Sequence, residues 1–254
     1  PVARPGPAAA EQRIIGGMLK VLMPEWQGCG LSNLVHDGAV ALAGAWWPEG
    51  PDLTIDAPRD EALVVDAGVK GLASMAPRLA GAIEALRASQ AERLVVVGGT
   101  CGVEVAPVAY LHERYGDDLA VVWLDAHADL NTPASSPSGH FHGMVLRTLL
   151  GDGPEAMTAI GRPLNPHQVF IVGARDLDPA EHAFIGRSEA TWLGPDVCDA
   201  PERLLDTLQR SGCHHVYVHF DVDVIDPQDF RSSYYQVPWG PTLAAMADTI
   251  GALH

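Results

Sequence analysis

The sequence predicts an α/β domain built on a mainly parallel β-sheet, and three observations support this prediction. Short apolar runs recur at residues 94–97, 120–124, 169–172 and 215–220, and continuous runs of this kind are typical of parallel strands buried on both faces. Each run is followed by a polar cluster. A stretch with helical spacing comes next, which is the alternation expected of an α/β domain. Because ligands bind beyond the carboxyl ends of such strands, we expect the polar clusters to meet in one crevice.

The remaining segments predict one clear helix and two irregular stretches. The spacing within residues 71–90 predicts a helix with one apolar face. That face contains Leu72, Met75, Leu79, Ile83 and Leu86. Residues 28–62 are rich in Gly, Pro and Trp, and we expect loops around short elements there. Residues 1–12, rich in Ala and Pro, are expected to form a flexible arm, and residues 1–254 together a single domain.

The composition argues against several classes of protein. The 254 residues carry 16 Lys and Arg against 32 Asp and Glu, a formal charge of −16, which disfavours a nucleic-acid or anionic-membrane partner. No stretch approaches the ~18–20 apolar residues of a membrane span, and the start lacks the apolar region of a secretory signal. The four cysteines show no CxxC spacing, which indicates reduced thiols in the cytoplasm. The acidic excess indicates either a solvated surface or a cationic ligand, such as a substrate or metal ions.

Two motifs at predicted strand ends indicate a site for divalent metal ions. If the strand before DAHAD continues, Asp125, His127 and Asp129 project to one side with a period of two, and Asp221 and Asp223 do the same after another strand. Each motif alone is common in turns, but both follow apolar runs directly. Carboxylate-rich donor sets with a histidine suit Mn(II) or Mg(II) better than soft-ligand metals. Two bridged ions would also remove the repulsion between four facing carboxylates.

Five ordered blocks resemble the signature of the ureohydrolase superfamily of arginases, agmatinases and related guanidino-acid hydrolases. The blocks are GGTCG (98–102), DAHADLNTP (125–133), SGHFHGM (138–144), GARDLDPAE (173–181) and HFDVDVIDP (219–227). The resemblance implies an arginase-like three-layer α/β/α domain, a centre of two Mn(II) ions and a metal-dependent amidinohydrolase. It also implies a small-molecule guanidino substrate, hydrolysed to urea and an amine, and a homo-oligomer such as a trimer or hexamer.

The same resemblance implies catalytic roles for individual residues. The matched metal-ligand positions are Asp125, His127, Asp129, Asp221 and Asp223. Asp129 is also expected to stabilise the tetrahedral intermediate, together with the metals. His142 resembles the histidine that moves a proton to the leaving amine. His140 either substitutes for it or is a solvent-exposed loop residue.

A second group of matches concerns the substrate. Asn131 and Ser138 match positions that in arginases bind the α-carboxylate, and Asp178 matches the position that receives the α-ammonium. This clamp favours an α-amino-acid substrate over agmatine. The alternative is that Asn131 and Ser138 are ordinary loop and capping residues.

Cys101 departs from the superfamily pattern, which normally has a histidine ligand at this position. Three interpretations are open. In the first, the Cys101 thiolate binds a metal and shifts the metal preference of the site toward Zn(II) or weakens Mn(II) binding there. In the second, Cys101 does not ligate and the metal site is distorted or half-empty, and in the third, Cys101 is a small packed residue in a metal-poor relative. A cysteine here resembles the branch of the superfamily that hydrolyses Nω-hydroxy-L-arginine to hydroxyurea and ornithine in D-cycloserine biosynthesis. An N-hydroxyguanidine can stall an ordinary dimanganese centre, so a loosened metal site would favour its turnover.

Other functions stay open beside this hypothesis. The chain is alternatively a plain arginase, another guanidino-acid hydrolase or a catalytically impaired homologue that acts as a binding subunit. A histone-deacetylase-like zinc amidohydrolase is disfavoured, because DAHADLN and DVDVIDP together contain ligands for a second metal. A Rossmann oxidoreductase is disfavoured as well, because GGTCG does not match GxGxxG.

Two more departures lie after residue 227. The loop 231–243 replaces a TGTPxPGG-like segment and contains Tyr234, Tyr235 and Trp239, which either wall a different substrate pocket or pack within the loop. No glutamate follows, so the late carboxylate that holds the guanidinium in arginase-like enzymes is not identified. We expect the C-terminus to be incomplete, because a parallel sheet that lacks a late strand would expose an edge.

Overall fold

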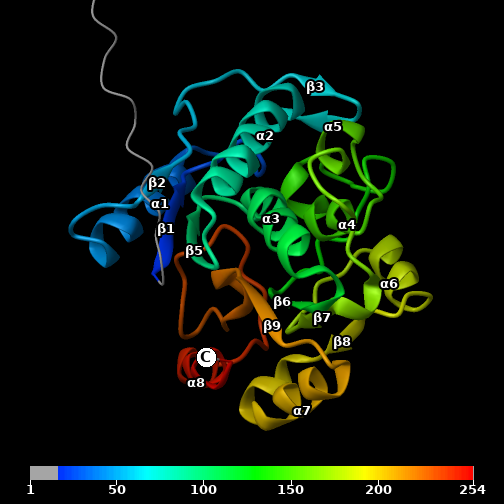
Figure 1. Cartoon of the computed structure of the whole chain (residues 1–254). Helices are drawn as coiled ribbons and strands as arrows, with labels where there is room; N and C mark the ends of the chain where they lie inside the picture. Colours follow the sequence, from blue (N-terminus) through cyan, green and yellow to red (C-terminus); the bar gives the residue numbers. More distant parts are fainter. Residues whose placement is uncertain (1–16, 254) are drawn as a thin grey trace, which may run out of the picture.

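The computed structural model describes residues 17–253, so the arm expected for residues 1–12 lies outside the described residues. Figure 1 shows the strands of the two main sheets with helices on both sides of them. The strands are β1 (Met18–Met23), β2 (Leu53–Thr54), β3 (Val65–Asp66), β4 (Val69–Lys70), β5 (Arg93–Gly98), β6 (Leu119–Leu124), β7 (Val169–Val172), β8 (Thr191–Leu193) and β9 (His215–Phe220). The α-helices are α1 (Leu34–Trp46), α2 (Leu72–Ser89), α3 (Val105–Tyr115), α4 (Val145–Leu149), α5 (Glu155–Thr158), α6 (Pro179–Ile185), α7 (Glu202–Ser211) and α8 (Leu243–Ala252). Within residues 17–253, no helix has both the length and the apolar character needed to cross a bilayer.

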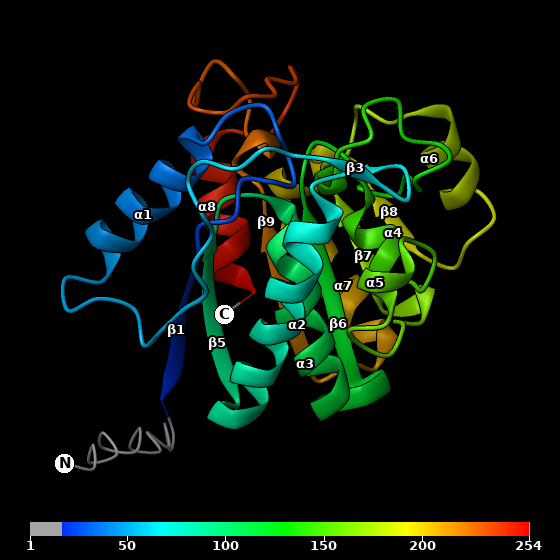
Figure 2. The same ribbon diagram turned by 90° about the horizontal axis from the view of Figure 1, so that it is seen from above.

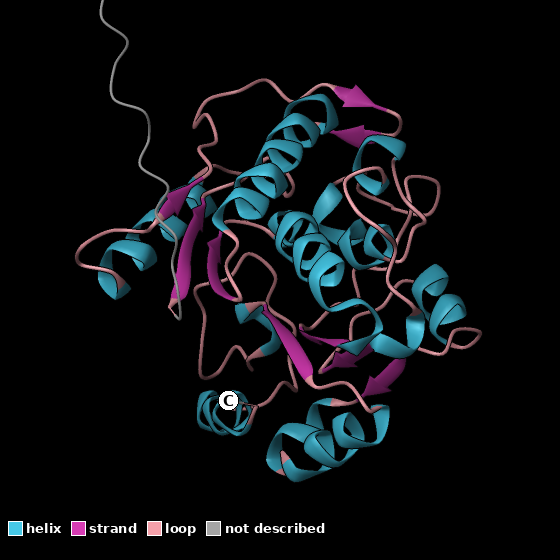
Figure 3. Ribbon diagram, viewed as in Figure 1, coloured by secondary structure: helices cyan, strands magenta, loops and turns pink. Residues whose placement is uncertain are grey.

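Seven strands form two parallel sheets, drawn in magenta in Figure 3. The order is β2-β1-β5 in the first sheet and β8-β7-β6-β9 in the second, and every pair is parallel. The four predicted strands are present as β5, β6, β7 and β9. Within the described residues, no strand pairing joins β5 to β9. The prediction of mainly parallel strands is therefore confirmed, and the structure adds that the strands are divided between two sheets.

Alternating residues of β6 build the three layers of the domain. One set faces the core shared with α2 and α3 and consists of Leu119, Val121 and Trp123. The other set faces the core shared with α7 and α8 and consists of Ala120, Val122 and Leu124. Figure 1 shows α2 and α3 on one side of the second sheet and α7 and α8 on the other. Because both faces of β6 are covered, its sequence is apolar throughout, and the predicted α/β/α layering is confirmed.

Helix α2 confirms one prediction, whereas α1 corrects another. All five residues of the predicted apolar face of α2 are buried. Helix α1 forms within residues 28–62, for which the sequence predicted loops around short elements, and it runs for 13 residues. Its buried residues are Ala39 and Ala43, which pack in a small cluster with residues of β1 and β5. A buried face made of alanines lacks the large apolar residues that reveal an amphipathic helix in a sequence.

The parallel strands place their carboxyl ends along one edge of the molecule. Figure 2 shows this edge at the top, where the loop after β9 is drawn in orange. The loops that follow β5, β6 and β9 lie at this edge, and they contain the residues from which the sequence predicted a metal site. The topology thus brings together residues that are far apart in the chain, such as Cys101 and Asp221, which are separated by 120 positions.

Candidate metal centre

Asp125 and His127 extend from the carboxyl end of β6. The backbone N–H of Asp125 donates to the carbonyl of Val172 at 3.2 Å, so the strand ladder continues one residue past β6. Asp125 is 1% exposed, and its Oδ1 accepts from the backbone N–H of His127 at 2.7 Å. The Nδ1 atom of His127 lies 3.3 Å from Asp125 Oδ1 and 3.1 Å from Asp223 Oδ2. The imidazole of His127 is thus held between carboxylates from two strand ends.

Asp129, the last residue of the same motif, lies in a strained turn. Its backbone has φ 51°, a left-handed conformation that costs energy for a residue with a side chain. The residue is 2% exposed, and its Oδ2 has no hydrogen-bond partner among the described residues. A buried carboxylate oxygen is costly unless it is paired or binds a cation. Asp129 therefore has the environment of a metal-binding or substrate-binding group.

Asp221 and Asp223 follow β9 and are fixed by short hydrogen-bonded turns. Asp221 Oδ1 accepts from the backbone N–H of Asp223 at 2.9 Å, at the start of a 3-10 turn over Val222–Val224. Asp223 Oδ1 accepts from the backbone N–H of Ala126 at 3.2 Å. That second bond ties the loop after β9 directly to the loop after β6. The spacing between the two acidic motifs is therefore set by the adjacent pairing of β6 and β9.

Cys101 reaches the same site from the end of β5. The preceding loop passes so close to Glu25 that a Cβ on Gly99 would lie 2.1 Å from the carbonyl oxygen of Glu25. The Oγ1 atom of Thr100 accepts from the backbone N–H of Gly102 and caps the 3-10 turn Cys101–Glu104. The Cys101 Sγ atom then lies 3.5 Å from Asp221 Oδ2. The close approach to Glu25 explains why position 99, two residues before Cys101, needs a glycine.

The side chains at these three strand ends form two clusters of possible metal ligands that share one residue. In each cluster the donor atoms lie within 4.8 Å of one another. The first cluster contains Cys101, Asp125, His219 and Asp221, and the second contains Asp125, His127 and Asp223. The structure thus brings together five of the six residues that the sequence predicted as ligands. Asp129 belongs to neither cluster, although its charge is one of those that act on the Cys101 thiol.

Several acidic groups of this site are buried close together, and the pKa values of most of them are raised. Burial and then the charges of Asp125 and Asp221 raise the pKa of Asp223 to about 8. Burial and neighbouring carboxylates likewise raise the pKa values of Asp129, Asp221 and the Cys101 thiol. Burial lowers the pKa of His127, but its carboxylate partners outweigh this and raise that pKa to about 12. Divalent cations would relieve this repulsion, and the unpartnered Asp129 oxygen also fits them.

His219 and Glu104 are parts of the site that the sequence analysis missed. His219 Nδ1 lies 3.0 Å from Glu104 Oε1, and its Nε2 lies 3.5 Å from Asp125 Oδ2. Both residues are buried, and Tyr217 donates a hydrogen bond to the other oxygen of Glu104. The spacing of His219 in the sequence could have identified it as part of the site. His219 precedes Asp221 by two residues, so the two side chains are expected on the same side of the strand.

The loop 231–243 places one aromatic side chain over the site. The hydroxyl of Tyr235 lies 3.5 Å from His142 Nε2, and the two rings are stacked at 5.3 Å. The Tyr235 ring also meets that of His127 edge to face at 5.6 Å. Trp239 of the same loop is 82% exposed. Of the two alternatives for this loop, Tyr235 supports a wall beside the site, and Trp239 does not contribute to it.

The two histidines of the HFHGM segment lie in different surroundings. Burial and then the charges of His140 and His127 lower the pKa of His142 to about 4. His140 is 6% exposed, and its Nε2 lies 3.1 Å from Lys70 Nζ. The expectation that His140 is a solvent-exposed loop residue is therefore wrong, because the β3-β4 hairpin that carries Lys70 covers it.

The predicted substrate clamp is only partly assembled. Asn131 Nδ2 donates to Asp178 Oδ2 at 2.8 Å, so two of its three residues are in contact. Asn131 Oδ1 accepts from the Ser135 hydroxyl, and Asp178 also caps the start of α6. Ser138 is exposed, and its hydroxyl accepts from the backbone N–H of His140 within its own loop. Asn131 and Asp178 thus have structural partners already, and a substrate would add to these contacts or exchange with them.

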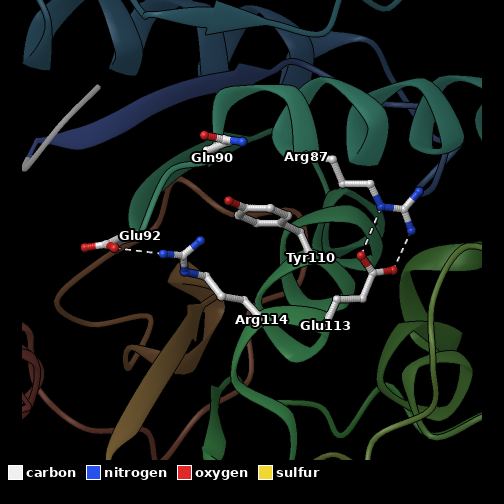
Figure 4. A pocket seen from close by; sticks show the side chains of 6 residues that line it. All are labelled: Arg87, Gln90, Glu92, Tyr110, Glu113 and Arg114. Atoms are coloured by element: carbon white, nitrogen blue, oxygen red, sulfur yellow. Dashed lines mark hydrogen bonds and ion pairs between the residues drawn. The ribbon is translucent and has the colours of Figure 1, made fainter. Parts of the chain in front are cut away.

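A separate hollow of about 520 Å³ lies at the opposite ends of the strands from Cys101. Figure 4 shows the side chains that line it, among them Arg87 paired with Glu113 and Arg114 paired with Glu92. Both arginines are therefore neutralised by adjacent carboxylates. The hollow offers no charge to a ligand beyond these pairs, and it lies outside the candidate centre.

Comparison with known proteins agrees with this geometry. Residues 51–254 match the model of the Arginase family. The arginase of Bacillus subtilis (strain 168) is 37% identical over 146 residues, which are 53% of this chain and 48% of that protein. The chain spans about half the length of the curated relatives it matches.

Two solved structures extend the likeness to most of the chain. The crystal structure of arginase from Bacillus subtilis has a TM-score of 0.77 at 26% identity and covers 93% of this chain and 86% of that one. The crystal structure of Entamoeba histolytica arginase in complex with L-ornithine has a TM-score of 0.79 at 20% identity, with 92% and 85% covered. The predicted arginase-like fold is therefore confirmed.

Proposed function

This chain belongs to the arginase family, and on that premise we propose that it is a metal-dependent hydrolase that cleaves the guanidino C–N bond of an arginine-type amino acid. The observation that carries the proposal is that Asp125 belongs to both ligand clusters. A carboxylate shared in this way suits a pair of divalent ions a few Å apart. The L-ornithine bound to the Entamoeba histolytica arginase supports an amino-acid substrate.

We propose that the centre holds two divalent ions, with Mn(II) expected for the carboxylate-rich cluster of Asp125, His127 and Asp223. Asp221 and Cys101 would hold the second ion with Asp125, and Asp129 would direct its unpartnered oxygen to the same region. When bound, the ions lower the pKa of a water molecule enough to provide a nucleophile near neutral pH. The residues present thus fit the metal centre that the family implies.

The remaining proposed roles belong to side chains of this chain. Asp129 stabilises the tetrahedral intermediate, because its carboxylate can accept a hydrogen bond from the N–H or O–H groups on the former guanidinium carbon. His142 carries a proton to the leaving amine, and Tyr235 positions its ring. Asn131 and Asp178 orient the amino-acid end of the substrate, since their contact places an amide and a carboxylate side by side.

Within this reaction class we propose Nω-hydroxy-L-arginine as the preferred substrate, with hydroxyurea and ornithine as products. Cys101 is the observation that favours it, because a thiol in the first ligand cluster gives one ion an unusual environment. The test is kcat/KM for Nω-hydroxy-L-arginine, L-arginine and agmatine, measured on the manganese-supplemented full chain. We expect the highest value for the hydroxylated substrate. A preference for L-arginine would leave a plain arginase, and a preference for agmatine would also contradict the amino-acid clamp.

A catalytically impaired homologue that serves as a binding subunit is the competing function. The departure at Cys101 is its support, and bound metal separates it from the enzyme. About two ions per folded chain, measured by elemental analysis after manganese supplementation, would support the enzyme. Their absence together with no turnover of any guanidino substrate would support the binding subunit. The homo-oligomer stays a prediction that light scattering of the purified chain would check.

Replacing Asn131 with alanine is expected to raise KM for the amino-acid substrate by about 10- to 100-fold, because a hydrogen bond to a charged group contributes about 1.5–3 kcal/mol. The value of kcat should change less, since the lost contact lies away from the scissile bond. Steady-state kinetics measure both constants. Ser135→Ala is the matched control, because Ser135 contacts the Asn131 amide but has no proposed contact with substrate. Equal KM values for Asn131→Ala and the unmodified chain would contradict the clamp.

A further inference from the structure

We propose that His219 is a metal ligand of this centre and that it binds the same ion as Cys101. The inference rests on the proposed metal centre but assigns a residue that the ureohydrolase resemblance did not. The ion would be held by a thiolate, an imidazole and two carboxylates, from Cys101, His219, Asp125 and Asp221. This donor set differs from that of the second ion, which has one imidazole and carboxylates only.

The surroundings of the His219 ring are those of a ligating histidine. The residue is 4% exposed, and its Nε2 has no hydrogen-bond partner among the described residues. That nitrogen faces the first cluster, with Asp125 Oδ2 at 3.5 Å. On the other side of the ring, Nδ1 lies 3.0 Å from Glu104 Oε1. Metal-binding histidines commonly donate one ring N–H to a carboxylate and direct the other nitrogen at the ion.

The sheet register holds the ring in this orientation. His219 on β9 is the register partner of Trp123 on β6, and the two rings are stacked at 3.8 Å. Tyr217 lies two residues earlier on β9 and donates to Glu104, so the carboxylate that orients His219 is itself held. Glu104 ends the same 3-10 turn that begins at Cys101. One turn and one strand therefore position the thiol, the imidazole and their supporting carboxylate together.

The metal position beside Cys101 has a thiolate and an imidazole among its donors, so its donor set is softer than that of the second metal position. Sulfur and imidazole donors favour Zn(II) or Co(II), whereas carboxylates and water suit Mn(II). We therefore expect two unlike ions or two unlike affinities at the centre.

The direct test is a crystal structure of the full chain grown with Zn(II) or with Co(II), in which anomalous scattering locates each ion. We expect one ion about 2.0–2.1 Å from His219 Nε2 and about 2.3 Å from Cys101 Sγ, the usual Zn–N and Zn–S distances. An ion near Cys101 with His219 Nε2 more than about 3 Å away would overturn the proposal. So would a Cys101 position that stays without metal at saturating concentration while His219 Nε2 keeps its place beside Asp125 Oδ2.

Variants test the same assignment in solution without measuring activity. His219→Gln is expected to lower the metal affinity of the site that contains Cys101 by more than about 100-fold, because loss of a direct ligand should cost more than loss of its supporting carboxylate. The same variant should lose the thiolate-to-Co(II) absorption band of the cobalt-loaded chain. Glu104→Gln should weaken that site by about 10- to 100-fold and keep the band at saturation. His112→Gln is the control, because His112 is also buried but lies on α3, outside both clusters. Retention of both ions with unchanged affinity in His219→Gln would overturn the assignment.

These measurements test the assignment of His219 as a ligand independently of the proposed reaction. If the chain binds metal through His219 but hydrolyses no guanidino substrate, the ligand assignment stands and the proposed reaction is wrong. If the substrate panel succeeds but His219 is not coordinated, the reaction stands and the assignment is wrong. Where His219→Gln does not fold, the crystal structure of the unmodified chain still decides.

Discussion

Asp125→Asn is expected to reduce kcat/KM by more than about 100-fold and to lower the metal content of the chain toward zero. The loss should exceed the 10- to 100-fold effect of removing a supporting residue, because Asp125 belongs to both ligand clusters. An asparagine retains the shape of the side chain but has only one acceptor oxygen and no charge. Elemental analysis and steady-state turnover of the manganese-supplemented chain measure the two effects.

Two further measurements make this expectation specific. Asp206→Asn is the matched control, because Asp206 lies on the exposed side of α7 and makes no contact with the centre. It should retain metal and turnover. Circular dichroism should show that Asp125→Asn still folds, since the substitution removes a negative charge that raises the pKa values of Asp221 and Asp223. Full metal content in folded Asp125→Asn would contradict the shared-ligand arrangement.

The second large effect is on stability, because the folded chain brings together buried carboxylates that the unfolded chain separates. A metal present at about 100 times its Kd stabilises a folded protein by about 2.7 kcal/mol if it does not bind the unfolded chain. For a chain of this size that corresponds to an increase in Tm of about 5–10 °C. Thermal unfolding of the metal-free chain with and without Mn(II) measures the shift, and Zn(II) can be compared in the same way.

The reason for the expected shift lies in the charges. Burial and neighbouring carboxylates raise the pKa values of Asp221 and Asp223, so each carries its negative charge at a cost in the metal-free fold. A chelator should reverse the shift, and Asp125→Asn should show a smaller one. An unchanged Tm at saturating metal, confirmed by bound-metal analysis, would mean that the centre is equally stable without cations and would contradict this interpretation.

Most of the fold could be read from local sequence patterns. The run 119–124 is apolar at every position because both of its faces are covered, so the strand and its parallel neighbours were predictable. Helix α1 was not, because its buried side consists of alanines and its larger residues are exposed. The division into two sheets was not predictable either, since strand order depends on contacts between distant segments.

In the candidate centre, too, residues within short motifs could be identified from the sequence, whereas contacts between distant residues could not. The motifs containing Asp125 and Asp221 were recognisable because their acidic residues alternate directly after strands. Glu104 could not be connected to His219, since they are 115 residues apart and meet only in the folded chain. Tyr235 gave no signal that separated it from Trp239, and only the folded loop places one over the site and the other in solvent.

The sequence alone determined the α/β class, the parallel strands and the acidic strand ends, because each depends on residues that are close together in the chain. The tertiary structure decided which of these ends lie close enough to share an ion, and it alone brought His219 beside Cys101 and Glu104. The physical reason is that a metal site needs donor atoms within a few Å of one another. That distance is set by strand order and register, which no local pattern encodes.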